Sequence, residues 1–163
     1  MIDVKKKIKQ INLLNYFNKK KVIFISNTAK NYKKKYYLTP IRETKKYIYF
    51  GAVISNEKVA EKICKLIDNK IDFILVDTEK KSKNLNKNKS INIERVVREN
   101  IHSSYIFYYK ANDLTVDAAE NFLKSYFRED IRNIGGKNIL VVGLGNIGFK
   151  LSLKLVESGA NVF

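Results

Sequence analysis

The chain has 163 residues, of which 45% are apolar and 29% are charged, a composition that suits a globular core and excludes a wholly disordered protein. No run reaches the roughly 20 apolar residues that span a bilayer, and the first residues lack the apolar core of a secretion signal. We therefore expect a cytoplasmic protein with no membrane partner. The single cysteine, Cys64, and the single histidine, His102, exclude a disulfide framework and a metal site built from either residue type.

The net charge is +16, from 32 Lys and Arg residues against 16 Asp and Glu residues. Such a charge attracts polyanions. The chain is also rich in Asn and Ile, with one Pro and no Trp, and this biased residue usage explains the charge without a dedicated nucleic-acid surface. Nucleic-acid binding stays as an alternative function, because lysines and tyrosines alternate over residues 30–37 in a pattern that suits single strands.

The hydrophobic pattern predicts helices and strands in alternation. A basic amphipathic helix is expected within residues 1–21, with its apolar face formed by Ile8, Ile11, Leu13 and Leu14. Short apolar runs predict strands over residues 22–25, 47–54, 72–77 and 104–109. Helices are expected over residues 55–68 and 91–101, and residues 79–90 have the polar, aperiodic composition of a loop.

A further helix is expected to begin at Thr115 as its N-cap, with an apolar stripe of Ala119, Phe122, Leu123, Tyr126 and Phe127. Alternation of this kind predicts an α/β fold with a mainly parallel sheet. A boundary near residues 131–136 would separate an N-terminal α/β domain, residues 1–134, from residues 135–163.

A glycine-rich turn follows the buried strand pattern of residues 138–142 and precedes a helix with Ile147, Leu151, Leu155 and Val156 on one face. Gly143 would permit the tight turn, Gly145 would let the backbone approach a diphosphate, and Gly148 would let the helix pack closely against the strand. The free amide groups near Asn146 and Ile147, at the positive end of the helix dipole, would hold the phosphates. A glycine turn without a ligand is the alternative interpretation.

Residues 136–163 resemble the opening βαβ unit of a Rossmann fold in NAD(P)-dependent dehydrogenases. The turn and residues 157–162 are similar to amino-acid dehydrogenases of the glutamate and leucine type, and the layout resembles shikimate dehydrogenases, adenosylhomocysteinases and D-2-hydroxyacid dehydrogenases. The resemblance implies an N-terminal substrate domain, hydride transfer to or from a small polar substrate such as an amino or hydroxy acid, and NAD or NADP as cofactor. The implied cofactor-binding residues are Gly143, Leu144, Gly145, Asn146, Ile147 and Gly148.

The acidic residue that would distinguish NAD from NADP is expected about 20 residues after Gly143, at or beyond Phe163. The chain is therefore expected to be a piece of a longer enzyme, inactive alone. Its unpaired strand edge favours self-association, so a homo-oligomer is expected.

The residues expected to carry acid–base catalysis are Lys110, Asp113 and Asp117, because the loop after a parallel strand lies at the edge of the sheet where α/β proteins bind ligands. The simpler interpretation is that Thr115 caps a helix and Asp117 is a favourable acid in its first turn. An NAD-using hydrolase of the adenosylhomocysteinase kind, or a protein that senses nucleotides, would use the same glycine-rich turn without net redox turnover.

Overall fold

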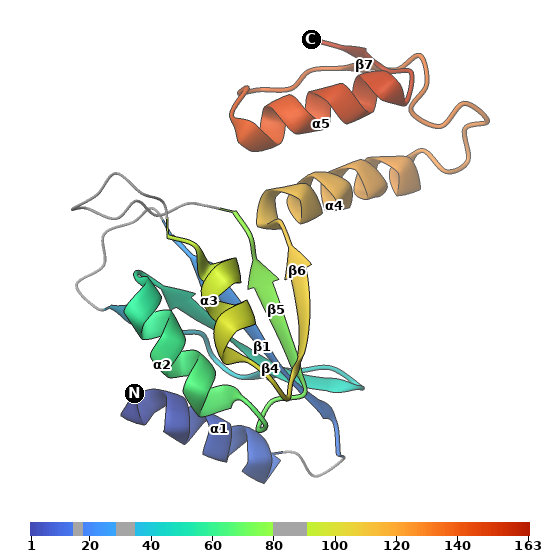
Figure 1. Ribbon diagram of the computed structural model, residues 1–163. Helices are drawn as coiled ribbons and strands as arrows, with labels where there is room; N and C mark the ends of the chain where they lie inside the picture. The colour runs from blue at the N-terminus through green and yellow to red at the C-terminus, as the bar shows by residue number, and fades with distance from the viewer. Residues whose placement is uncertain (15–17, 29–34, 80–90) are drawn as a thin grey trace. The chain divides into compact units, whose positions relative to one another are not determined.

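The computed structural model describes residues 1–14, 18–28, 35–79 and 91–163, which form two compact units, residues 1–109 and 110–163 (Figure 1). Most of the predicted loop at 79–90 and of the lysine–tyrosine segment at 30–37 therefore lies outside the described residues. No helix within the described ranges is long and apolar enough to cross a membrane.

The first unit contains a mostly parallel sheet, as the sequence predicts. Its strands lie in the order β2-β4-β1-β5-β6; β4, β1, β5 and β6 are parallel, whereas β2 and β3 pair antiparallel with β4. The elements are α1 (Ile2–Leu14), β1 (Lys20–Asn27), β2 (Tyr36–Leu38), β3 (Arg42–Glu43), β4 (Tyr47–Ile54), α2 (Glu57–Ile67), β5 (Phe73–Asp77), α3 (Ile93–Asn100) and β6 (Tyr105–Tyr109).

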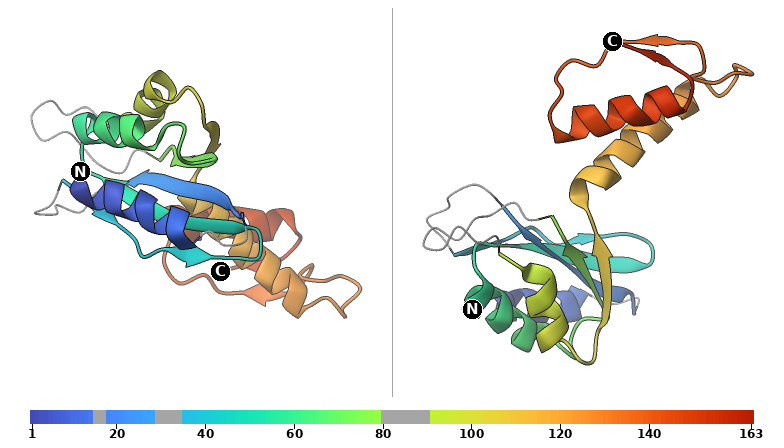
Figure 2. Two further views of the ribbon diagram at one scale, coloured as in Figure 1. Left: turned by 90° about the horizontal axis from the view of Figure 1, so that it is seen from below. Right: turned by 45° about the horizontal axis from the view of Figure 1, so that its top comes forward.

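The order of connections explains why α2 and α3 lie on the same side of the sheet (Figure 2). The crossovers from β4 to β5 and from β5 to β6 advance in the same direction along the sheet, so right-handed crossovers place both helices on one face. The step from β1 to β4 runs the opposite way, and among the described residues it contains the short antiparallel strands β2 and β3 instead of a helix.

The core of the first unit lies between this face and the three helices. The alternate strand residues that point toward the helices are buried, as the period of two requires, and they include Ile23, Ile25, Phe50 and Ile74. In α1, Ile8 and Ile11 are buried as predicted, but Leu13 and Leu14 are exposed, so the predicted face of that helix was too wide.

The second unit is built from two helices and a pair of parallel strands. Its elements are α4 (Ala111–Tyr126), β7 (Asn138–Ile139), α5 (Asn146–Glu157) and β8 (Asn161–Val162). The connection from β7 to the parallel strand β8 passes through α5. Ile134, Leu155 and Ala160 form the centre of a small core, against which Leu123 of α4 and Phe127, the C-cap of that helix, pack.

Two predictions for α4 were wrong. The helix begins at Ala111, directly after β6, and Thr115 lies inside it, where its hydroxyl donates to the carbonyl of Ala111 at 3.0 Å. The apolar stripe is narrower than predicted, because Phe122 and Tyr126 are about three-quarters exposed (70% and 74%). The boundary between the two units lies between Tyr109 and Lys110 in the chain, whereas the sequence predicts a boundary near residues 131–136. Helix α4 belongs with the C-terminal strands because its apolar residues join their core.

Candidate functional site

The glycine-rich turn occupies the link between β7 and α5. The buried strand predicted over residues 138–142 was wrong, because β7 ends at Ile139 and Leu140 and Val142 are 73% and 90% exposed. The predicted apolar face of α5 was too wide, since Leu155 is buried but Ile147 and Val156 are exposed.

Gly143 has a φ of 97°, a left-handed conformation that side-chain-bearing residues rarely adopt. Backbone geometry alone therefore explains the glycine at position 143.

Gly148 lies in the first turn of α5, folded back against the start of the link. A Cβ atom on residue 148 would stand 2.0 Å from the carbonyl oxygen of Gly143 and 3.6 Å from a methyl group of Val141. A backbone atom occupies the space, so no side chain fits without moving the turn. Close packing between helix and turn explains the glycine at position 148, whereas the sequence predicts packing of the helix against the strand.

Gly145 differs from the other two glycines. Its backbone angles, φ −69° and ψ −176°, are accessible to any residue, and a Cβ atom there would meet nothing within 4 Å. Neither backbone strain nor close packing therefore requires a glycine at position 145. The open space beside it lies at the N-terminus of α5.

At the N-terminus of α5, the positive end of the helix dipole, no described side chain caps the free amide groups. Gly145 occupies the N-cap position and offers no side-chain acceptor, and the first turn contains no acidic residue. The amide of Phe149 donates to the carbonyl of Gly145 at 2.9 Å, which is the first hydrogen bond of the helix. The amide groups that precede Phe149 point along the helix axis, as in helix N-termini that bind anions.

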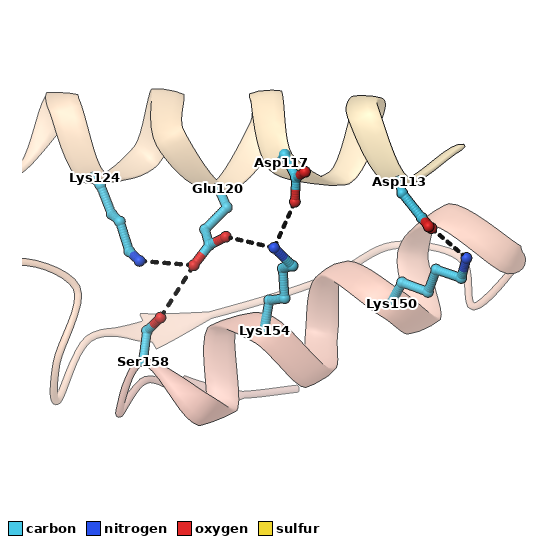
Figure 3. Close-up of polar contacts among 7 residues, drawn as sticks. All are labelled: Asp113, Asp117, Glu120, Lys124, Lys150, Lys154 and Ser158. Carbon is cyan, nitrogen blue, oxygen red and sulfur yellow. Dashed lines mark hydrogen bonds and ion pairs between the residues drawn. The ribbon is translucent and has the colours of Figure 1, made fainter. Parts of the chain in front are cut away.

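The predicted catalytic carboxylates lie on a different surface, between α4 and α5 (Figure 3). Lys150 donates to Asp113, and Lys154 donates to both Asp117 and, at 3.2 Å, Glu120. The hydrogen bond from Lys150 lowers the pKa of Asp113, and the hydrogen bond that Lys154 donates to Asp117 raises the pKa of Lys154.

Glu120 is the best-connected member of this helix–helix interface. It forms an ion pair with Lys124 at 2.7 Å and accepts a hydrogen bond from Ser158 at 3.3 Å (Figure 3). Hydrogen bonds from Lys124 and, with a smaller effect, from Lys154 lower the pKa of Glu120. Asp113 and Asp117 each accept a hydrogen bond from a lysine of α5, so these contacts hold the two helices together and give both residues a structural role. Their catalytic roles stay predictions.

Lys110 lies near this network, because its charge adds to the effect of Lys150 in lowering the pKa of Asp113. It is exposed at the N-cap position of α4, whose end receives no side-chain cap. The structure therefore brings Asp113 and Asp117 together along one face of α4, with Lys110 close enough to Asp113 to act on it through its charge.

The sequence contains a signal for the interface that periodicity arguments about apolar residues miss. Asp113, Asp117 and Glu120 recur at helical spacing on α4, and Lys150 and Lys154 recur four residues apart on α5. Residues at this spacing share a helix face. Matching an acidic face to a basic face would have predicted the pairing of α4 with α5.

Comparisons with models of protein families, with curated proteins and with solved structures found no match to this chain. A function must therefore be inferred from the chemistry and geometry of its own residues.

Proposed function

We propose that residues 143–148 bind the diphosphate of NAD or NADP, and that the chain is part of an oxidoreductase that transfers a hydride to or from a small polar substrate such as an amino or hydroxy acid. The glycine-rich turn supports the first part of this proposal. The resemblance of residues 136–163 to NAD(P)-dependent dehydrogenases supports the second part.

Gly145 is the observation that carries the proposal. A turn that only reversed the chain direction would need glycine at positions 143 and 148, but not at position 145, where any residue fits. Serine, aspartate or asparagine would also cap α5 better than glycine does. A diphosphate resting on the helix N-terminus would explain both the missing side chain and the missing cap, since it would fill the space and accept hydrogen bonds from the free amides.

The surrounding elements support the same interpretation. β7, α5 and the parallel strand β8 follow one another in the order that dinucleotide-binding units use. The amides expected to contact the phosphates are those of Asn146 and Ile147, and Leu144 and Ile147 are exposed beside them. The adenosylhomocysteinase-like and nucleotide-sensing alternatives share this loop and differ from the leading proposal only in turnover.

Binding of the cofactor can be tested with the protein and three variants. NADH and NADPH are titrated while nicotinamide fluorescence and saturation-transfer NMR are recorded, so that binding as weak as about 1 mM is detected. Gly145→Val should abolish binding, because its side chain would occupy the position of the diphosphate. Gly145→Ser should also weaken binding, since its hydroxyl would take an amide donor that the phosphates need.

Leu153→Val is the matched control, because it places the same β-branched side chain at an exposed position on α5 away from the turn. It should bind as the unchanged protein does. Equal affinity of the unchanged protein and Gly145→Val for both dinucleotides would overturn the proposal. Absorbance at the nicotinamide band, followed with a panel of amino, keto and hydroxy acids, then separates an oxidoreductase from a hydrolase or sensor.

A further inference from the structure

The first unit has a second face on its sheet, opposite the helices, and this face is covered with aromatic rings. In register, Tyr49 of β4 lies beside Val22 of β1, which lies beside Phe73 of β5 and then Tyr105 of β6. The next row contains Phe24, Leu75 and Phe107. We call the face formed by these two rows the aromatic face.

The rings of the aromatic face touch one another. The Phe73 ring lies 5.9 Å from the rings of Tyr105 and Phe107, measured between centroids. The Phe24 ring lies 5.7 Å from that of Tyr49. At the β6 edge the rings are open to solvent, since Tyr105 is 71% exposed and Phe107 is 53% exposed. An exposed, continuous group of aromatic side chains on a soluble unit marks a binding surface.

The charges beside the aromatic face are positive. The register places Lys20 beside Tyr47 and Arg42 beside Tyr49, on the same side of the sheet as the rings, and both cations are exposed. Among the described strand residues on this side of the sheet, the acidic one is Asp77. It is 1% exposed, and its carboxylate accepts a hydrogen bond from the amide of Glu79. Solvent therefore meets cations and rings on this face.

The charge of the chain is also concentrated in this unit. Residues 1–109 contain 25 of the 32 Lys and Arg residues and 10 of the 16 Asp and Glu residues, so they carry 15 of the 16 net positive charges. Residues 110–163 contain 7 cations and 6 anions. A uniform bias in residue usage would raise the charge of both units, so it does not explain this division.

We propose that the aromatic face binds single-stranded nucleic acid, with bases stacked on Tyr105, Phe107 and their neighbours and phosphates beside Lys20 and Arg42. Exposed rings on a sheet accept unpaired bases of any sequence, and flanking cations hold the backbone. A second copy of this chain is a poorer occupant, because two units that each carry 15 net positive charges repel one another. This site is independent of the glycine-rich turn.

Fluorescence anisotropy of labelled oligo(U) and oligo(dT), each about 12 nucleotides long to span such a site, tests the proposal with the whole chain. Tyr105→Ala with Phe107→Ala should weaken binding of both oligomers by at least about ten-fold, since two stacking rings are lost. Lys20→Gln with Arg42→Gln should weaken binding and reduce its salt dependence. Tighter binding of oligo(U) than of oligo(dT) would identify RNA as the preferred strand.

The matched control is Phe122→Ala with Tyr126→Ala, which removes two equally exposed rings from the second unit. It should bind as the unchanged protein does, and circular dichroism should show all variants folded. The proposal is overturned if the two aromatic variants bind alike, or if a duplex of the same sequence binds as tightly as the single strand. It is also overturned if the unchanged protein binds neither oligomer. In that case, a dimer that is detected by sedimentation and dissociated by the double variant Tyr105→Ala with Phe107→Ala would show that a second copy occupies the aromatic face. Gly145→Val should leave oligonucleotide binding unchanged, so failure here is distinguishable from failure of the dinucleotide proposal.

Discussion

The carbonyl oxygen of Gly143 occupies the space in which a side chain on Gly148 would begin, with 2.0 Å between that oxygen and the position of the missing Cβ. The two glycines depend on each other, since the left-handed conformation of the first aims its carbonyl at the second. Gly145, between them, meets no such constraint. The motif therefore combines two glycines required by the backbone with one that the backbone leaves unexplained.

Gly148→Ala should destabilise the second unit, because a backbone atom has to move to admit the new methyl group. Overpacking of this kind costs about 1–3 kcal/mol. Hydrogen exchange measured by mass spectrometry on peptides from residues 138–163 would detect the loss as faster exchange. Gly145→Ala is the control, since its methyl group enters open space, and its exchange should rise less than that of Gly148→Ala, by no more than the loss of a glycine N-cap explains. Equal exchange in both variants would show that the turn adjusts freely.

The N-caps provide a second comparison. The side chain of Asn56 accepts a hydrogen bond from the amide of Val59 at 3.0 Å and so caps α2. Asn56→Ala should lower the free energy of unfolding of the first unit by about 1 kcal/mol. Thr115→Ala should change the stability of α4 by less than about 0.5 kcal/mol, because Thr115 bonds to the carbonyl of Ala111 within the helix and caps nothing. Denaturant titrations followed by circular dichroism would measure the first effect, and hydrogen exchange in α4 the second. A larger effect for Thr115→Ala than for Asn56→Ala would contradict the assignment of the two caps.

These two residues also show how far the sequence predicts the fold. Asn56 follows a strand with a clear period of two and precedes an apolar face with a clear helical period, so the pattern alone predicted a helix over residues 55–68, close to the observed bounds of α2. Thr115 matches the local preference for an N-cap equally well, but α4 begins four residues earlier, at Ala111, with no capping side chain. Local preference was overridden because the helix continues directly from the end of β6.

The apolar stripe of α4 was overestimated for a related reason. Periodicity identifies which residues share a face, but it does not show how wide a surface the partner covers. The small core formed by Ile134, Leu155 and Ala160 reaches Leu123 and Phe127 but leaves Phe122 exposed. The glycine turn was placed correctly because its geometry is local. The aromatic face could not be predicted, since it depends on the order of strands in the sheet.

The interface between α4 and α5 should make the second unit sensitive to pH at both extremes. The pKa values of Asp113, Glu120 and Asp130 are lowered by hydrogen bonds from Lys150, Lys124 and Lys137 respectively. Their contribution to stability is present above the ordinary pKa of carboxyl groups, about 4, and is lost as the pH falls through the lowered values. The pKa of Lys154 is raised by Asp117, so its contribution is present below the ordinary pKa of lysine, about 10.4, and is lost as the pH rises through the raised value.

Hydrogen exchange corrected for the intrinsic effect of pH would measure both limbs. Glu120→Gln should flatten the acid limb, because it removes the carboxylate that joins Lys124, Lys154 and Ser158. Glu157→Gln is its control, since it removes an exposed carboxylate at the end of α5. Loss of the acid limb in the control and not in Glu120→Gln would show that the stability arises elsewhere.

Cys64 should be inert toward thiol reagents while the first unit is folded. It is fully buried within α2, and burial raises the pKa of its thiol to about 12, so both access and thiolate formation are suppressed. Labelling by a disulfide reagent near pH 8 should be at least about 100-fold slower than that of a free cysteine and should reach the free rate in denaturant.

A cysteine placed at an exposed position in the same molecule, Ser103→Cys, provides the reference for an accessible thiol and should label within the mixing time. Asn56→Ala should speed the labelling of Cys64 by about the factor by which it lowers stability, roughly five-fold for 1 kcal/mol, because the thiol reacts only when α2 opens. Fast stoichiometric labelling of the folded, unchanged protein would contradict this account and would make Cys64 a candidate nucleophile. Slow labelling that follows the stability of the α2 cap assigns Cys64 to the core.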